Sequence, residues 1–334
     1  MPTYLITGGC GFIGSNYIRH LHTTQPDTHI VNLDKLTYAG NPANLADLQD
    51  SDRYTFIHGD ICDPETVNAV MAQYRPNVVI NFAAESHVDR SIEDPSAFIR
   101  TDVEGVYRLC EAALAHRVDR FLQISTDEVY GSIESGSFSE DATLMPSSPY
   151  AASKAGGDRL AFSYWVTHQL PVLITRASNN YGPYQYPEKL IPLLITNALC
   201  NEPLPLYGDG QNVRDWLNVA DHCTAIDTVL AHGEPGEVYN VGAGNEYTNL
   251  EIALQILGLL GLPDDIIQFI PDRKGHDRRY AVRTDRIRRL GWAPKTDFEE
   301  GLQTTVEWYV NNESWWQPIR NGEFKEYYRR RYQC

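Results

Sequence analysis

The strongest constraint on the fold is a glycine-rich turn near the amino terminus, between a short apolar run and a helical pattern. Residues Thr3 to Thr7 are typical of a strand, glycines follow at positions 8, 11 and 14, and the helical pattern continues to about His22. Such glycines permit a tight turn, close approach of a pyrophosphate to the backbone, and close packing of helix on strand. We therefore expect this turn to bind a dinucleotide through Gly8, Gly11, Phe12, Ile13 and Gly14.

An acidic residue at the end of the next strand supports this interpretation. The run from His29 to Leu33 is followed by Asp34, twenty residues after Gly14. A carboxylate there can accept hydrogen bonds from both ribose hydroxyls and repels a 2′-phosphate, which favours NAD over NADP. The neighbouring Lys35 weakens that preference. The alternative, that Asp34 is only a solvated carboxylate at a strand end, stays open at this point.

Further strands and helices alternate along the first half of the chain. Strand patterns occur at residues 54–58, 78–82, 121–125 and 172–175, and helical patterns at 64–74, 97–116 and 150–168. This alternation predicts the α/β class, with a Rossmann-type, doubly wound parallel sheet. Ligands of such sheets lie beyond the carboxyl ends of the strands. We therefore expect one cleft to be lined by Asp60, Ile61, Ala83, Ala84, Glu85, Ser86, His87 and residues 125–128.

The alternation breaks after residue 175, where glycine and proline become frequent. We expect an NAD-binding Rossmann domain over residues 1–177, with returning segments near 215–245. Residues 178–334 are predicted to form mainly a smaller, interleaved C-terminal lobe that binds the substrate.

Composition excludes several classes of protein. The chain has 44 acidic and 28 basic residues and a formal charge of −16, which disfavours nucleic acid as a partner. A phosphate ligand would need backbone amides and a few placed arginines. Six cysteines show no CxxC pair, the first strand begins at Thr3, and no apolar stretch approaches the roughly 18 residues of a membrane span. We expect a cytoplasmic protein with no membrane contact.

A tyrosine and a lysine open one of the predicted helices. Tyr150 and Lys154 follow Pro149 at i,i+4 spacing, which puts the phenol and the ammonium on one helix face. The ammonium and a cationic nicotinamide would both favour the phenolate, so Tyr150 could accept a hydroxyl proton as a hydride leaves. The alternative is an interfacial tyrosine beside a lysine whose stem covers apolar surface.

The glycine pattern and the Tyr150–Lys154 pair resemble the extended short-chain dehydrogenase/reductase superfamily. Within it, five motifs spread over nearly the whole chain resemble the dTDP-glucose 4,6-dehydratase family. These motifs are Asp34 to Asn41, Glu85 to Ser91, Thr126 to Gly131, Asn179 to Gln185 and Gly275 to Tyr280.

The adjacent carboxylates Asp127 and Glu128 distinguish this family from simpler oxidoreductases, because elimination of water needs a separate base and a separate acid. The resemblance implies that Tyr150, aided by Lys154 and Thr126, oxidises C4 of the sugar with hydride transfer to NAD⁺. Glu128 would then remove the C5 proton, and protonated Asp127 would donate to the departing C6 hydroxyl. Return of the hydride to C6 gives a 4-keto-6-deoxy sugar and restores a tightly bound NAD. Neighbours on a strand point to opposite sides, so both carboxylates can reach the sugar only from a turn or a helical start.

The resemblance also implies the remaining contacts. Cofactor contacts are expected from Asp34, Lys35, Thr37, Asp60, Ile61, Ala83, Ala84, Ser86, Thr101, Tyr150, Lys154 and Asn180. Substrate contacts are expected from Ser86, His87, Thr126, Asn179, Lys189, Leu190, Pro205, Tyr207, Arg214, Asn249, Arg273, His276 and Tyr280. Arginine suits a diphosphate because its planar fork donates two hydrogen bonds, although a lone arginine more often forms a surface salt bridge. No metal is expected.

The superfamily further implies a homodimer, in which helices 97–116 and 150–168 of each subunit form a four-helix bundle. Gly156 and Gly157 would then permit close approach of the helices. Three functional alternatives stay open: a UDP-glucose 4,6-dehydratase, a nucleotide-sugar 4-epimerase or decarboxylase of the same superfamily, and a non-catalytic sensor that binds a dinucleotide.

Overall fold

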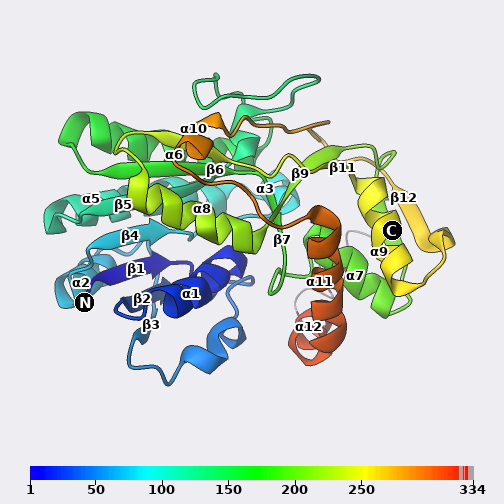
Figure 1. Cartoon of the computed structure of the whole chain (residues 1–334), viewed down its shortest axis with the longest axis horizontal. Coiled ribbons are helices and arrows are strands. Elements are labelled where there is room, and N and C mark those ends of the chain that lie inside the picture. Colours follow the sequence, from blue (N-terminus) through cyan, green and yellow to red (C-terminus); the bar gives the residue numbers. More distant parts are fainter. Residues whose placement is uncertain (323–325, 327, 330–334) are drawn as a thin grey trace.

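The centre of the molecule is a seven-stranded sheet in which every pair of neighbours is parallel (Figure 1). This computed structural model describes residues 1–322, 326, 328 and 329, so Cys334 and the last residues of the predicted lobe lie outside the described residues. The strand order is β10-β6-β5-β4-β1-β2-β3. The strands are β1 (Thr3–Thr7), β2 (His29–Asp34), β3 (Tyr54–His58), β4 (Val78–Asn81), β5 (Arg120–Thr126), β6 (Val172–Ala177) and β10 (Val238–Val241). The predicted Rossmann-type sheet is confirmed.

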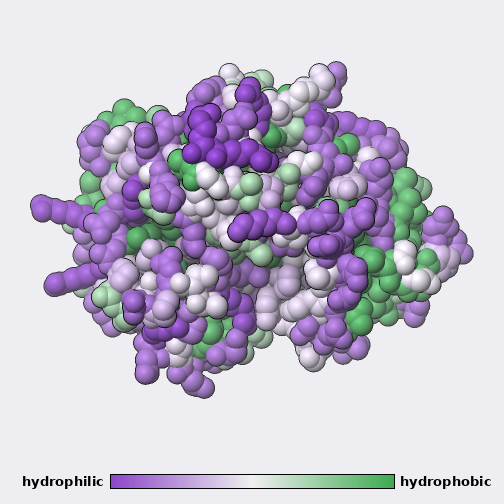
Figure 2. Space-filling view, viewed as in Figure 1, coloured by the Kyte–Doolittle hydropathy of each residue, from purple (hydrophilic) through white to green (hydrophobic). Residues whose placement is uncertain are grey.

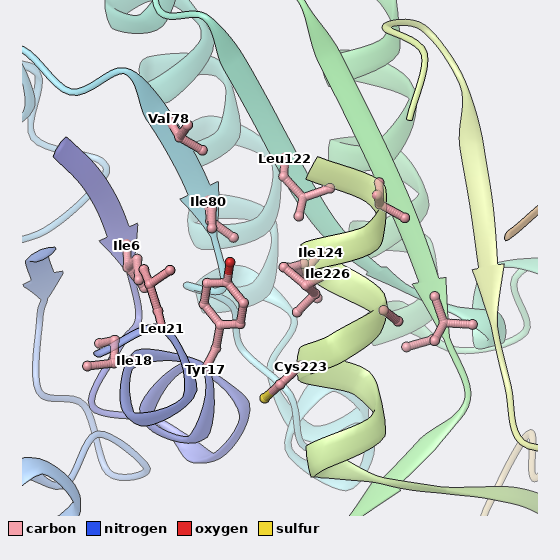
Figure 3. Packing of buried hydrophobic residues seen from close by; sticks show 14 of the residues in the cluster. Ile6, Tyr17, Ile18, Leu21, Val78, Ile80, Leu122, Ile124, Cys223 and Ile226 are labelled. Carbon is pink, nitrogen blue, oxygen red and sulfur yellow. The ribbon is translucent and has the colours of Figure 1, made fainter. Parts of the chain in front are cut away.

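Helices cover both faces of this sheet because alternate strand residues are apolar on both sides. One face carries α1 (Phe12–Thr24) and α8 (Val219–His232); the other carries α2 (Pro64–Tyr74), α5 (Val106–His116) and α6 (Pro149–His168). Figure 3 shows the first face, where side chains of α1 and α8 meet those of the strands. These side chains include Ile6, Tyr17, Ile18, Leu21, Ile80, Leu122, Cys223 and Ile226.

A smaller lobe lies beside the sheet, on the right of Figure 1, and has its own apolar core. Its helices are α7 (Leu190–Leu199), α9 (Asn249–Leu260), α11 (Phe298–Asn311) and α12 (Glu313–Asn321). Two small sheets accompany them, β11 (Glu246–Thr248) with β9 (Val213–Asn218) and β7 (Asn179–Tyr181), and β12 (Ile267–Ile270) with β8 (Leu204–Tyr207). Between β9 and β11 the chain returns to the main sheet as α8 and β10, so the two parts are interleaved.

The helical run predicted over residues 97–116 is confirmed, but it is not one regular α-helix. A short helix α4 (Ser96–Ile99) leads into a π-helical turn, Arg100–Gly105, before α5 begins. The wider turn brings the buried carboxylate of Asp102 to the backbone N–H of Glu85, at 3.1 Å, and to the hydroxyl of Ser153, at 2.6 Å. The π-helical turn thus occurs where Asp102 accepts hydrogen bonds from Glu85 and Ser153, two residues outside the helical run.

The two glycines of α6 serve close contacts within the chain. A Cβ on Gly157 would lie 2.1 Å from the backbone oxygen of Asp102, and a Cβ on Gly156 would lie 3.1 Å from a methyl group of Val103. The helix that carries Tyr150 and Lys154 thus packs directly on the π-helical turn.

Figure 2 shows a mainly hydrophilic surface, with an apolar area over α9 and β12. These elements carry the exposed apolar side chains Leu254, Leu259 and Phe269. Within the described part of the chain, no helix combines the length and the apolar character needed to cross a membrane.

Alanine substitutions at two helical glycines, one tightly packed and one in open space, should change the free energy of unfolding in opposite directions. Gly157→Ala should lower the free energy of unfolding by about 2 kcal/mol, because overpacking against a backbone oxygen outweighs the gain of about 1 kcal/mol from helix propensity. Gly258→Ala in α9, where the added Cβ meets nothing within 4 Å, should raise it by up to about 1 kcal/mol. Urea unfolding measures both, and a stabilised Gly157→Ala variant would contradict the packing described here.

Candidate active site

One pocket lies beyond the carboxyl ends of the central strands, where a doubly wound sheet binds its ligands. All the residues predicted to bind the cofactor line it, as do all five predicted catalytic residues. The lining includes Gly8, Gly11, Phe12, Ile13, Gly14, Asp34, Lys35, Thr37, Asp60, Ile61, Ala83, Ala84, Ser86, Thr101, Thr126, Asp127, Glu128, Tyr150, Lys154, Asn179, Asn180 and Lys189. The structure therefore brings the two predicted groups together in one site.

The glycine turn offers what a pyrophosphate and a ribose require. Gly11 precedes α1 in the N-cap position and has no side chain to cap the helix, so the first N–H groups of α1 are available to an anion. Gly8 has a φ of +68°, and a Cβ there would lie 2.6 Å from the backbone of Ala83. The carboxylate of Asp34 accepts hydrogen bonds from the N–H groups of Cys10, at 2.8 Å, and Leu36, at 2.7 Å. Its remaining lone pairs suit ribose hydroxyls, so these residues fit a bound NAD.

Tyr150 lies in the first turn of α6, whose start is fixed by the hydroxyl of Ser148 accepting from the N–H of Ala151. The i,i+4 spacing predicts that Lys154 favours the phenolate, but the ammonium donates instead to the carbonyl of Ile124 at 2.9 Å. Burial, followed by the charges of Glu128 and Asp102, raises the pKa of Tyr150 well above its usual value. The protein's own groups thus favour the protonated phenol, and of the two cations in the prediction it is the nicotinamide of NAD⁺ that would favour the phenolate.

Asp127 and Glu128 lie on a 3₁₀ turn (Asp127–Tyr130) that follows β5 directly. The turn is capped by Thr126, whose hydroxyl accepts from the N–H of Glu128 at 3.3 Å. Because the backbone leaves the extended conformation there, both carboxylates line the pocket instead of pointing to opposite faces of a strand.

The surroundings of the two carboxyl groups differ. Burial, and then the charges of Glu128 and Asp215, raise the pKa of Asp127 well above its usual value, and its Oδ2 atom has no hydrogen-bond partner in the described structure. Burial also raises the pKa of Glu128, but three cations oppose this shift. They are Arg273, Arg214 and Lys189. The arrangement therefore favours a proton on Asp127 and a negative charge on Glu128.

A buried ion pair holds the catalytic helix against this turn. The guanidinium of Arg176, on β6, donates to both carboxylate oxygens of Asp158, on α6, at 2.9 and 3.0 Å. It also donates to the hydroxyl of Tyr130, at 2.8 Å, and that hydroxyl donates to Asn240 at 2.7 Å. Arg176 and Asp158 are almost fully buried. One network thus links β6, α6, β10 and the turn that carries Asp127 and Glu128.

Several predicted substrate residues gather beside the pocket rather than in its lining. The Arg214 guanidinium lies 4.2 Å from the ring centre of Tyr280, and the rings of Tyr207 and His276 are 6.0 Å apart. Arg273 lies 3.9 Å from Asp89. The charges of Arg214 and Arg273 act on Glu128, which places this group next to the carboxylates.

Other predicted substrate residues are not brought to the pocket lining. Leu190 packs on the lobe core, Pro205 is buried in β8, and Asn249 begins α9. His87 is buried, 4.0 Å from Glu188. Substrate contact by these four residues stays a prediction.

The sequence analysis missed several lining residues, among them Gln185, Tyr186, Glu188 and His222. The first three lie between Asn180 and Lys189, which were predicted to bind ligands, so their position in the sequence could have identified them. Nothing in the spacing points to His222, whose Nδ1 lies 2.9 Å from the side-chain oxygen of Asn180. Burial lowers the pKa of His222 to about 4, so the ring is neutral and donates to that oxygen.

The pKa of His222 predicts an acid-sensitive stability. The unfolded chain protonates this histidine near its usual value of 6.5, whereas the folded protein does so only near 4. Stability is therefore lost as the pH falls from 6.5 towards 4, by up to about 3 kcal/mol. A His222→Asn variant, which keeps a donor for Asn180, should lose less over this range in urea unfolding. His232→Asn, at an exposed position on the same helix, is the control, and equal pH slopes for wild type and His222→Asn would contradict the assignment.

A tyrosine and lysine beside a dinucleotide pocket, on a Rossmann-type sheet with an interleaved lobe, define an extended short-chain dehydrogenase/reductase. Comparison with known proteins narrows this class. The family model described as GDP-mannose 4,6 dehydratase matches residues 5–305. A dTDP-glucose 4,6-dehydratase of Streptomyces niveus is 51% identical over 96% of both chains, and one of Xanthomonas campestris pv. campestris is 49% identical over 97% of this chain and 98% of its own.

The solved structures agree. The crystal structure of DesIV, a dTDP-glucose 4,6-dehydratase from Streptomyces venezuelae with NAD and TYD bound, is 48% identical, with a TM-score of 0.93 over 95% of this chain and 99% of that chain. The chain belongs to the dTDP-glucose 4,6-dehydratase family.

Proposed function

We propose that this protein converts dTDP-glucose to dTDP-4-keto-6-deoxyglucose and water, with NAD as a tightly bound cofactor. The observation that carries the proposal is the 3₁₀ turn after β5, which brings two carboxyl groups of different proton affinity into the pocket that Tyr150 also lines. A 4-epimerase needs the tyrosine but not a separate acid and base. The sequence relatives named above are dehydratases of the same nucleotide sugar.

The side chains divide the chemistry among them. NAD, when held by the glycine turn and Asp34, supplies the capacity to take up a hydride and to give it back. Tyr150, with Thr126 and Lys154, binds the C4 hydroxyl and accepts its proton as the phenolate, the form that the positive charge of a bound NAD⁺ would favour. Glu128 accepts the C5 proton, which a C4 ketone makes acidic, and Asp127 gives its proton to the C6 oxygen as that oxygen departs as water.

The two parts of the chain take different ligands in this proposal. Residues 1–177, with the segment near 215–245, hold NAD, and most of residues 178–334 bind the nucleotide and the diphosphate. Arg214 and Arg273 supply the positive charge that the diphosphate requires in a protein of net charge −16.

The first experiment supplies the purified protein, without added cofactor, with dTDP-glucose or UDP-glucose and follows the products by mass spectrometry. Loss of one water molecule, faster from the thymidine sugar, is the expected result. An unchanged mass with inversion at C4 would mean an epimerase and would overturn the proposal. Equal rates for both sugars would refute only the preference for thymine over uracil. The two bases differ by one methyl group, which can discriminate between them by about 1 to 3 kcal/mol.

Two carboxyl variants test the division of roles. Asp127→Asn and Glu128→Gln should each lower the rate of dehydration by about 10² to 10⁴-fold, because each removes a group that transfers a proton. Reduced-nicotinamide absorbance should accumulate in Glu128→Gln, since removal of the C5 proton follows oxidation at C4. Near-normal dehydration by either variant would contradict the proposed elimination.

We also propose a cytoplasmic homodimer, joined through α5 and α6 of each subunit. The five cysteines in the described residues are unpaired, which fits a reducing compartment. Side chains that are apolar and exposed occur on α4, α5 and α6, which pack together: Ile99 is 57% exposed, Tyr107 36% and Val166 56%. Burial of this area in a second copy would remove it from water.

Charged substitutions in this area test the dimer. The double variant Ile99→Glu with Val166→Glu should be monomeric by light scattering, because four carboxylates would enter one apolar interface. Leu254→Glu with Leu259→Glu on α9, at comparably exposed apolar positions, should remain dimeric. A monomeric wild type, or a dimeric first variant, would contradict the proposed interface.

A further inference from the structure

Three side chains outside the chemistry described so far form a row that leads away from Glu128. The hydroxyl of Tyr280 lies 3.5 Å from the Oε2 atom of Glu128 and 2.7 Å from the Oδ2 atom of Asp277. The same Oδ2 atom accepts a hydrogen bond from the hydroxyl of Ser147. Tyr280 is 2% exposed and Asp277 9%, whereas Ser147 is exposed at the surface. The row therefore begins at the pocket and ends in solvent.

The directions of the hydrogen bonds suit outward movement of a proton. Tyr280 has one hydroxyl proton, and the shorter contact assigns it to Asp277. The phenol oxygen then keeps a lone pair for a donor on its other side, which Glu128 becomes once it carries a proton. The contact of 3.5 Å is long, as catalytic hydrogen bonds often are before substrate binds.

Neighbouring groups hold the row in place. The Arg214 guanidinium lies over the ring of Tyr280, and its Nη2 atom donates to the backbone carbonyl of Asp277 at 3.0 Å. The side chain of Asn212 donates to the same carbonyl at 3.1 Å. Burial raises the pKa of Tyr280, which disfavours a free phenolate. A proton must therefore enter and leave this hydroxyl in one concerted shift.

We propose that Tyr280, Asp277 and Ser147 form a proton relay between Glu128 and solvent, an inference that rests on the function proposed above. In the elimination, the C5–H bond breaks and its proton goes to Glu128. The electron pair forms the C5–C6 double bond as the C6–O bond breaks, and Asp127 protonates the departing oxygen to give water.

The relay then exchanges the proton on Glu128. That proton passes to the Tyr280 oxygen while the phenol proton passes to Asp277, and Asp277 releases a proton through Ser147 to water. The reverse shift returns a solvent proton to Glu128, which delivers it to C5 as the product forms. The exchange involves no oxidant or reductant, and it gives the product a C5 hydrogen that comes from the solvent.

The test follows the C5 hydrogen in heavy water. Unlabelled dTDP-glucose is converted in D₂O for a short time, because a C5 hydrogen beside a ketone also exchanges free in solution, and the product is analysed by NMR. Wild type should give product that is mainly deuterated at C5. In Tyr280→Phe, which keeps the ring under Arg214, Glu128 should return the original proton, so that product with hydrogen at C5 becomes the majority.

Two further variants complete the test. Asp277→Asn breaks the row at its second member and should also raise the share of hydrogen at C5. Tyr247→Phe is the matched control, since it removes a hydroxyl from a ring stacked on Phe298 in the same lobe and should leave the product deuterated. Thermal unfolding and the content of bound NAD identify variants that fail to fold.

The outcomes separate the two proposals. Full deuteration at C5 in an active Tyr280→Phe or Asp277→Asn variant would overturn the relay while leaving the dehydratase function intact. Failure of the wild type to release water from the sugar would refute the function itself. Retention of hydrogen at C5 by wild type would show that no relay operates.

Discussion

The ion pair between Arg176 and Asp158 is the interaction on which the active site depends most. It is almost inaccessible to water, and loss of one partner from such a pair costs about 3 to 5 kcal/mol because the other charge stays buried. Both carboxylate oxygens of Asp158 accept hydrogen bonds from Arg176, and the Nη1 atom of Arg176 donates to the hydroxyl of Tyr130. Tyr150 lies on α6 and the two carboxyl groups lie on the turn after β5, and this network holds these two elements together.

Much of the fold followed from periodicity. The strands of the first half and helices such as α2 are local patterns of apolar residues, and their bounds lie within a few residues of those predicted. The π-helical turn at Arg100–Gly105 was missed because its polar partners, Glu85 and Ser153, are distant in sequence. The lobe was predicted only in outline, since its short strands pair across long separations; β7 and β9 are an example.

The site shows the same division. Residues of the glycine turn and of the strand ends could be placed, because a doubly wound sheet brings strand ends to one edge. The pKa of Tyr150 could not be predicted from its spacing to Lys154. It depends on burial and on the charges of Glu128 and Asp102, whose positions relative to the phenol are not visible in the sequence. Likewise, Ser147 and Asp277 meet across 130 residues of sequence, and only the folded chain shows that contact.

The pocket takes its walls from both parts of the molecule, and this arrangement has a metabolic consequence. The Nη2 atom of Arg90 lies 3.2 Å from the Oε2 atom of Glu188 on the other side, and the ammonium of Lys189 donates to the carbonyl of Ser86. These contacts join the two parts of the chain beside the pocket that fits NAD. Since the proposed reaction returns NAD to its starting state in each turnover, the flux of sugar through the enzyme is independent of the ratio of NAD⁺ to NADH in the cell.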